Sequence, residues 1–179
     1  QWVPGDNRWE YGYGGYFREG KPLTDICFRQ YRQLPQGLSC RVVELTGDKR
    51  DSVVRFVSPL LERTRYNGFL QFDIKENAET RELFLLDINP RPWKSSDMLA
   101  VKLGKTTVFN PVPTGRKVLW RIPFADWRSE KNPNNPPRSY RPEKGGHFTR
   151  MAAVFSVGDP VPWFDSLALE VGKILKRRF

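Results

Sequence analysis

The sequence predicts an α+β fold in which a mostly antiparallel sheet is packed with helices. Strand-like segments follow one another with turn signals between them, and one stretch has the apolar period of a helix instead. Hydrophobic residues make up 39% and aromatic residues 13% of the 179 residues. This is a globular composition, and the chain is long enough to bury a substantial core.

The first strands are expected between residues 9 and 45. After an extended entry with the turn signal VPGD, the segment WEYGYGGYF alternates aromatic residues with glycines. REGK is typical of a hairpin turn, and it leads into PLTDICFRQYRQL. PQG interrupts the pattern and LSCRVVEL resumes it. The order of these segments predicts consecutive antiparallel strands.

The apolar period changes after residue 50. Apolar residues recur there at the spacing of one helix face: Val53, Val54, Val57, Leu60 and Leu61. Asp51 or Ser52 is expected to cap this helix, and YNG to end it. Two further strands are predicted over residues 68–75 and 82–89, and a short helix over residues 96–103.

The C-terminal third changes in composition. Residues 128–147 are rich in Pro, Asn and Gly and predict a long loop or linker, in which His147 is expected to have no chemical role. We therefore expect one lobe over residues 1–127, this loop, and a C-terminal part over residues 148–179. That last part is expected to hold a strand near MAAVFSV and a helix from Asp165 or Ser166 with a basic end.

Charge and composition narrow the function. A net charge of +10 indicates anionic partners, either nucleic acid or a phosphorylated small molecule such as ATP. Because no C2H2 spacing, RRM signature or basic zipper is present, nucleic acid is not the expected partner. No apolar run approaches the length of a membrane span. Cys27 and Cys40 lie in strand-like contexts and are expected to be buried thiols, which favours the cytoplasm.

Two predicted strands each carry an acid where burial should exclude one. Alternation along a strand places Gln71, Asp73 and Lys75 on one face, and it places Leu85, Asp87 and Asn89 on one face of the next strand. A hairpin centred near Thr80 sets Asp73 opposite Asp87, with their Cβ atoms about 4.5 to 5.5 Å apart.

Like charges directly opposite one another destabilise a sheet, and a divalent cation between them reverses that effect. Carboxylate oxygens and the amide oxygen of Asn89 suit Mg²⁺, while Lys75, Arg91 and Arg29 or Arg32 could attract phosphates. The alternative is that Asp73 and Asp87 mark only the solvated face of a sheet.

The order of these residues resembles the ATP-grasp superfamily of carboxylate–amine ligases. That family has an acid on one strand and Glu-x-Asn on the next, positions taken here by Asp73, Asp87 and Asn89. The continuation PRPW, followed by a short helix and LGKTT, looks like the subgroup that has Asn-Pro-Arg-x-Trp-Gly-Ser. Asp87 stands where glutamate is commoner, and Lys94 stands where glycine is usual. Gln71 stands where some relatives carry arginine.

The N-terminal QWVPGDN is similar to the interlobe hinge that holds adenine in this family. By this likeness Gln1, Trp2 and Val3 line the adenine pocket, and Asp6 or Asn7 contacts the ribose. The alternative for Trp2 is ordinary hinge packing. FRQYRQLPQG resembles a segment whose basic residues approach the phosphates or the substrate carboxylate. The alternative for Arg29 is a solvated strand residue.

The resemblance implies that the chain is the C-terminal part of an ATP-grasp enzyme using ATP and Mg²⁺ with small-molecule carboxylate and amine substrates. Asp73 and Asn89 would each hold magnesium, and Asp87 would bridge two ions. Arg91 would steady the transferred phosphoryl oxygens, with Arg29 and Lys75 also near them; alternatively, Lys75 forms a salt bridge with Asp73. Two other functions stay open: a non-catalytic module that binds polyanions, and a degenerate ATP-grasp fold that binds nucleotide without chemistry.

Overall fold

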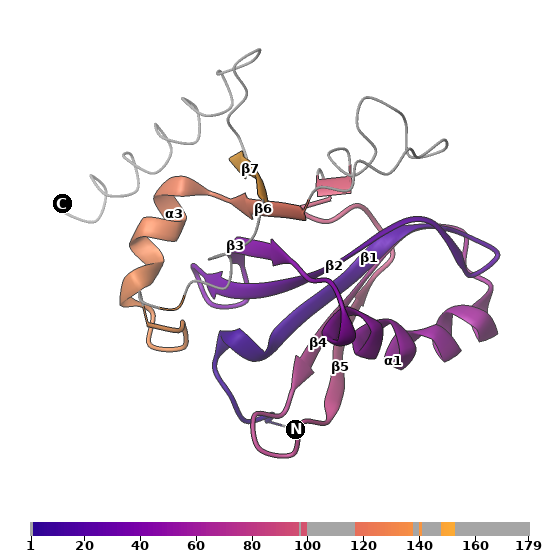
Figure 1. Ribbon diagram of the computed structural model, residues 1–179, viewed down its shortest axis with the longest axis horizontal. Helices are drawn as coiled ribbons and strands as arrows, with labels where there is room; N and C mark the ends of the chain where they lie inside the picture. Colours follow the sequence, from indigo (N-terminus) through magenta and orange to yellow (C-terminus); the bar gives the residue numbers. More distant parts are fainter. Residues whose placement is uncertain (1, 97, 100–116, 138–139, 141–147, 153–179) are drawn as a thin grey trace, which may run out of the picture.

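The structure is a computed structural model of the chain, and it describes residues 2–96, 98–99, 117–137, 140 and 148–152 (Figure 1). Gln1, His147 and the predicted helix from residue 165 lie outside the described residues. Of the helix predicted over residues 96–103, only its first part is described, and Met98 and Leu99 are helical.

One sheet runs through the described chain, in the order β5-β4-β1-β2-β3-β6-β7 (Figure 1). Its strands are β1 (Glu10–Arg18), β2 (Lys21–Gln33), β3 (Ser39–Glu44), β4 (Gly68–Glu76), β5 (Leu83–Asn89), β6 (Lys117–Arg121) and β7 (Phe148–Ala152). Neighbouring strands are antiparallel except β6 and β7, which are parallel. The predicted α+β class with a mostly antiparallel sheet is therefore confirmed.

Helix α1 (Asp48–Thr64) begins earlier than predicted. Its N-cap is Gly47, with φ 68°, so the cap expected at Asp51 or Ser52 is wrong. The added first turn holds Lys49, whose Nζ lies 2.8 Å from Oε2 of Glu76 on β4. The first turn of the helix is thus supported by an ion pair with β4, and it precedes the first residue of the apolar pattern. Arg65, rather than a glycine, takes the left-handed conformation that ends it.

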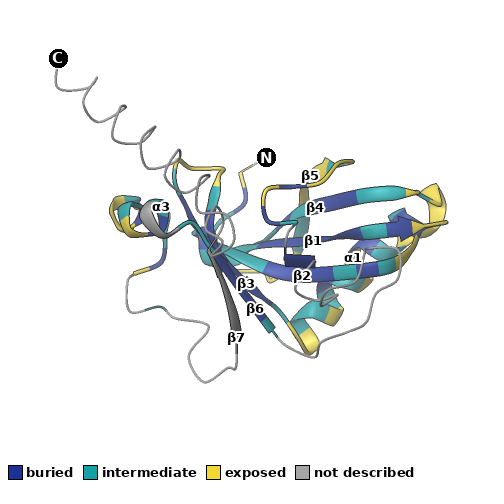
Figure 2. Cartoon of the chain, turned by 90° about the horizontal axis from the view of Figure 1, so that it is seen from above, coloured by how far each residue is buried: buried dark blue, intermediate teal, exposed yellow. Residues whose placement is uncertain are grey.

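The sheet buries a different core on each face. Figure 2 shows α1 against one face of β1 and β2. That face holds aromatic and aliphatic residues of the sheet together with those of α1: Tyr11, Tyr13, Phe17, Cys27, Val53, Val57, Leu61, Leu70, Phe72 and Ile74. The other face packs Ile26, Phe28, Val42, Trp93, Met98, Leu99, Val118 and Trp120. Both cysteines are buried and free, as predicted.

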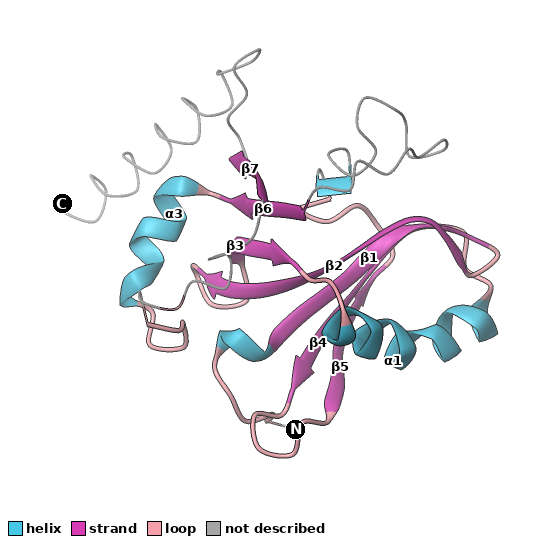
Figure 3. Ribbon diagram, viewed as in Figure 1, coloured by secondary structure: helices cyan, strands magenta, loops and turns pink. Residues whose placement is uncertain are grey.

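Shorter helical segments lie near β2 and β3. Helix α3 (Pro123–Arg128) follows β6 and lies near β2 and β3 (Figure 3). It continues into the 3-10 turn η2 (Ser129–Lys131), and a second 3-10 turn, η1 (Asn7–Trp9), precedes β1. In the described parts of the chain, every helix is too short or too polar to cross a lipid bilayer.

Gly12 on β1 leaves room for an aromatic ring. A Cβ atom at this position would lie 2.2 Å from Cε2 and 2.3 Å from Cζ of Phe28, whose ring is stacked on that of Trp93. We expect Gly12→Ala to lower the free energy of unfolding by about 1 to 3 kcal/mol, because the buried ring must move. Denaturant unfolding measures this loss. In a Phe28→Leu background the same substitution should cost less, and an equal cost in both backgrounds would contradict the ring contact.

Candidate active site

Strands β4 and β5 bring the two predicted acids together. Asp73 is paired with Asp87 and Gln71 with Asn89, which is the predicted register. An irregularity follows toward the turn, where Ile74 is paired with Leu85. Cross-strand partners share a face, so Leu85 does not lie on the face of Asp87 and Asn89, and that part of the prediction is wrong.

Two amide side chains hold one oxygen of Asp73. Nε2 of Gln30, on β2, and Nε2 of Gln71 each donate to Oδ1 of Asp73 at 2.6 Å. The hydroxyl of Ser39 donates to the side-chain Oε1 of Gln30 and so fixes that side chain in turn. Burial raises the pKa of Asp73 above its usual value; the charge of Asp87 also raises it, while the two amide donors and Arg91 lower it. Asp73 is therefore fixed in position, with its negative charge incompletely compensated.

The amide of Asn89 lies between the two carboxylates. Its Nδ2 is 3.2 Å from Oδ2 of Asp73 and 3.2 Å from Oδ2 of Asp87. Its Oδ1 accepts from Nη2 of Arg91 at 2.9 Å. The other oxygen of Asp87, Oδ1, accepts from the backbone N–H of Ile88 at 2.9 Å. The structure thus gathers the predicted metal ligands and Arg91 into one cluster.

Trp93 anchors the segment that carries Arg91. Its ring is buried on the Phe28 side of the sheet, and its Nε1 donates to Oγ of Ser95 at 3.1 Å. A Cβ atom at Gly14 would lie 2.8 Å from this ring, so the glycine admits the indole. Arg91 itself is exposed. The anchored indole therefore presents an exposed cationic side chain just after the end of β5.

Lys75 lies on the acidic face but has another partner. The register pairs Glu10 with Lys75 and Gly12 with Asp73, so Lys75 and Asp73 share a face two residues apart, or about 7 Å along the strand. Nζ of Lys75 lies 3.4 Å from Oε1 of Glu10. Burial raises the pKa of Glu10, and the neighbouring Lys75 lowers it. The ion pair of Lys75 is thus with Glu10, and not with Asp73 as the alternative had it.

Arg29 lies on the opposite face from the acids. It is paired with Tyr11, which belongs to the core under α1, whereas Asp73 is paired with the neighbouring Gly12. The guanidinium lies over the Tyr11 ring, 5.3 Å from its centroid, and donates through Nη1 to the hydroxyl of Tyr140. The structure does not bring Arg29 together with Asp73, Asp87 and Arg91.

The N-terminal segment runs beside the turn of the β4–β5 hairpin. The N–H of Ala78, in that turn, donates to the carbonyl of Pro4 at 3.2 Å. Val3 is buried and Trp2 is 79% exposed. An indole so exposed is not packed against the described residues of the chain. Gln1 lies outside the described residues.

Asp6 and Asn7 are already engaged within the chain. Asp6 caps η1 by accepting from the N–H of Arg8 at 2.9 Å, and it also forms an ion pair with that side chain. Asn7 is only 1% exposed, and its amide bonds both Asn135 and Gln36. A ribose contact by either residue would require one of these contacts to be exchanged.

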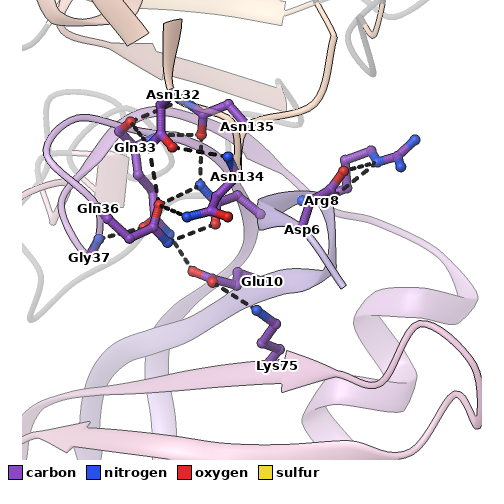
Figure 4. A network of polar contacts seen from close by, with 11 residues as sticks. Asp6, Arg8, Glu10, Gln33, Gln36, Gly37, Lys75, Asn132, Asn134 and Asn135 are labelled. Atoms are coloured by element: carbon purple, nitrogen blue, oxygen red, sulfur yellow. Dashed lines mark hydrogen bonds and ion pairs between the residues drawn. The ribbon is translucent and has the colours of Figure 1, made fainter. Parts of the chain in front are cut away.

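The Asn-rich segment after η2 folds onto the end of β2 (Figure 4). Asn132 and Asn135 both donate through Nδ2 to the carbonyl of Gln33 at 3.0 Å, and Oδ1 of Asn135 accepts from its N–H. The side chain of Gln33 donates to Glu10, the partner of Lys75. A segment about 100 residues away from Gln33 in sequence therefore supports the position of Lys75, through Gln33 and Glu10.

The atoms that face the gap suit a hard divalent cation. Oδ2 of Asp73 and Oδ2 of Asp87 both accept from the amide nitrogen of Asn89, so two carboxylate oxygens meet at one point, and such oxygens are suitable ligands for a hard cation. Within the described part of the chain, no three His, Cys, Asp or Glu side chains group so that they could hold a metal ion. Further ligands would have to be amide oxygen, water or substrate, which is usual for Mg²⁺.

Gln30 is the site residue that sequence reasoning missed. Strand alternation places it on the face opposite Arg29, which is the face of Asp73. The signal for it is present in FRQYRQ, where Gln30 follows Arg29 directly and so must lie on the other face of the strand. The pairing of β2 with β3 is also irregular between Arg29 and Arg32.

No protein-family model and no curated protein matches the sequence. Among solved structures, the chain is similar to the biotin carboxylase domain of a thermophilic 2-oxoglutarate carboxylase bound to bicarbonate, at 12% identity and a TM-score of 0.47, over 61% of this chain and 25% of that one. It is also similar to an L-amino acid ligase from Bacillus licheniformis, at 12% identity and a TM-score of 0.44, over 61% of this chain and 29% of that one.

A complete multifunctional pyruvate carboxylase from Rhizobium etli is 14% identical, with a TM-score of 0.44, over 53% of this chain and 10% of that one. The chain therefore spans less than a third of the length of each of these three proteins. Each is a partial likeness in fold, at an identity too low to carry over an activity.

Proposed function

We propose that this chain is the C-terminal portion of an ATP-grasp enzyme that uses Mg-ATP to join a carboxylate to an amine or a similar nucleophile through an acylphosphate. The observation that carries the proposal is the cluster that strands β4 and β5 form with Arg91. Asp73 is paired with Asp87 across the β4–β5 ladder, and Asn89 and Arg91 complete the group.

In this proposal the chain contributes charge and position. Asp73, Asp87 and Asn89 would hold magnesium through their carboxylate and amide oxygens, and Arg91 would neutralise phosphate oxygens nearby. Bound Mg-ATP would supply the phosphoryl group that activates the carboxylate substrate. No side-chain nucleophile is required, because catalysis of phosphoryl transfer is mostly positioning and electrostatic stabilisation.

The nucleotide would extend along the face that carries Lys75. The N-terminal segment, with its exposed Trp2 indole, lies at the hairpin turn, and Lys75 is two residues nearer to that turn than Asp73. Adenine at the segment and phosphates at the acids therefore place Lys75 beside the middle of the ligand. Arg29, on the other face, is not part of this site. Two free, buried thiols support a reducing compartment, and we propose the cytoplasm.

Titration calorimetry of the whole chain with ATP tests the proposal. We expect Mg²⁺ to strengthen ATP binding roughly tenfold, and Asp87→Asn to remove that gain, since one carboxylate near a divalent cation contributes on the order of 1 to 2 kcal/mol. Asp48→Asn is the matched control, because it removes the same charge from the exposed first turn of α1.

The rival function is a non-catalytic module that binds polyanions through the +10 charge. It predicts binding of ATP and of unrelated polyanions that weakens steeply with salt and is indifferent to Mg²⁺ and to Asp87. Equal binding by the Asp87→Asn variant and by the unchanged chain, with and without Mg²⁺, would contradict the proposed enzyme site.

A further inference from the structure

The NH₂ group of Asn89 occupies the position between the carboxylates that a bridging cation would take. It donates to Oδ2 of Asp73 and to Oδ2 of Asp87, each at 3.2 Å. The chemistry fixes this orientation, because the amide oxygen turned inward would face two carboxylate oxygens with no hydrogen between them. Without a cation, the partly positive NH₂ group is the stable choice.

Arg91 fixes the same orientation from the outer side. Its Nη2 donates to Oδ1 of Asn89 at 2.9 Å, and its Nη1 donates to the carbonyl of Pro92 at 3.2 Å. An arginine cannot accept a hydrogen bond, so it can bind the amide only through the oxygen. The amide is therefore held with its nitrogen inward and its oxygen outward.

Metal ligation requires the opposite orientation. A cation binds the amide through its oxygen, so Oδ1 must turn toward Asp73 and Asp87, and the bond to Arg91 must break. The freed guanidinium is exposed and needs an anionic partner, and phosphate oxygens are well matched to it.

We propose that Asn89 and Arg91 couple the binding of the cation to the binding of a phosphate-bearing ligand. With neither bound, Arg91 holds Asn89 in the orientation that opposes a cation. An anion that draws Arg91 away releases the amide, and a cation that turns the amide releases Arg91 to the anion, so each favours the other. This inference rests on the proposed function, since it assumes the cation site.

Three oxygens of the cluster could ligate a cation. Oδ1 of Asp73 accepts from the amides of Gln30 and Gln71, and Oδ1 of Asp87 accepts from the backbone N–H of Ile88. Oδ2 of each carboxylate accepts from Asn89 instead. Turning Asn89 would add its Oδ1 to these two oxygens.

Mn²⁺ binding by the whole chain, followed by electron paramagnetic resonance without any nucleotide, tests the coupling. We expect Arg91→Ala to strengthen Mn²⁺ binding roughly tenfold, because the variant no longer loses a charge-assisted hydrogen bond when the amide turns. Part of that gain is the removal of a positive charge, which at an exposed position changes affinity only about two- to threefold.

A second background separates the two effects. Asn89→Leu has a similar volume but no amide for Arg91 to hold, so adding Arg91→Ala there should give only the smaller, charge-based gain. Equal gains in the two backgrounds would overturn the coupling while leaving the cation site intact. Failure of every variant, and of the unchanged chain, to bind Mn²⁺ would overturn the cation site and the coupling with it.

Discussion

Replacing Glu76 with alanine is expected to lower the free energy of unfolding by about 1.5 to 3 kcal/mol, the usual contribution of hydrogen bonds to a charged group. Glu76 is fully buried at the end of β4. Oε2 accepts from the hydroxyl of Tyr11 at 2.7 Å and lies 2.8 Å from Nζ of Lys49, while Oε1 lies 2.7 Å from Nε of Arg81. One carboxylate thus joins β1, the first turn of α1 and the β4–β5 turn.

Denaturant unfolding of three variants tests this role. Glu79→Ala, at an exposed position of the same turn, should change stability by less than about 0.5 kcal/mol. Glu76→Gln keeps an acceptor for Tyr11 but loses the charge, so its loss should be intermediate. A loss below about 1 kcal/mol for Glu76→Ala would show that Lys49 and Arg81 are satisfied by water instead.

The hairpins could be predicted because their signals are local. Glycine and turn residues lie at the reversals, and the pairing of Asp73 with Asp87 follows from placing the centre of one hairpin at Thr80. The start of α1 could not be predicted in this way. Lys49 belongs to the helix through its ion pair with Glu76, a residue 27 positions away, and no apolar period marks it.

The site was predictable where it depends on one hairpin and not where it depends on neighbouring strands. Asp73, Asp87, Asn89 and Arg91 lie on or directly after β4 and β5, and they meet as expected. The charge of Arg29 predicts that it lies near the acids, but Gln30 is the residue that does. The register of β2 on β1 sets which of these two residues lies on the same side of the sheet as Asp73. That register needs the whole sheet.

The Asn-rich segment shows a further limit of local patterns. Asn132 and Asn135 look like loop residues, yet their side chains satisfy the backbone of Gln33 at the end of β2. Such side-chain contacts replace the backbone hydrogen bonds of a neighbouring strand, and no periodic pattern in the sequence predicts them. The division of the chain into lobe, loop and C-terminal part stays a prediction.

Asp73→Asn should separate the functional role of Asp73 from a structural one, since it should stabilise the cation-free protein while removing cation binding. Asparagine keeps an Oδ1 for Gln30 and Gln71 and can turn its NH₂ group toward Asp87. The bond from Asn89 to Oδ2 of Asp73 is lost, but the amide nitrogen of Asn89 keeps Oδ2 of Asp87 as an acceptor. Removing one of two like charges that face each other should raise the free energy of unfolding by about 0.5 to 1 kcal/mol at neutral pH.

The same substitution should remove a pH dependence. Because burial and the charge of Asp87 raise the pKa of Asp73, the folded chain binds this proton more readily than the unfolded chain. The stability cost of the ionised carboxylate is therefore present above the raised pKa and disappears as the pH falls through it. Cation binding should weaken over that same pH range, because the proton takes the place of the metal.

Two measurements on Asp73→Asn decide between the roles. Denaturant unfolding across that pH range should show a flatter profile than the unchanged chain, and Mn²⁺ affinity should fall roughly a hundredfold, because a half-buried carboxylate is lost from a site of reduced dielectric. A variant that is less stable and still binds Mn²⁺ would make Asp73 a structural acid. A variant that is more stable and no longer binds the cation identifies a charge that the fold retains for its ligand, at the expense of stability.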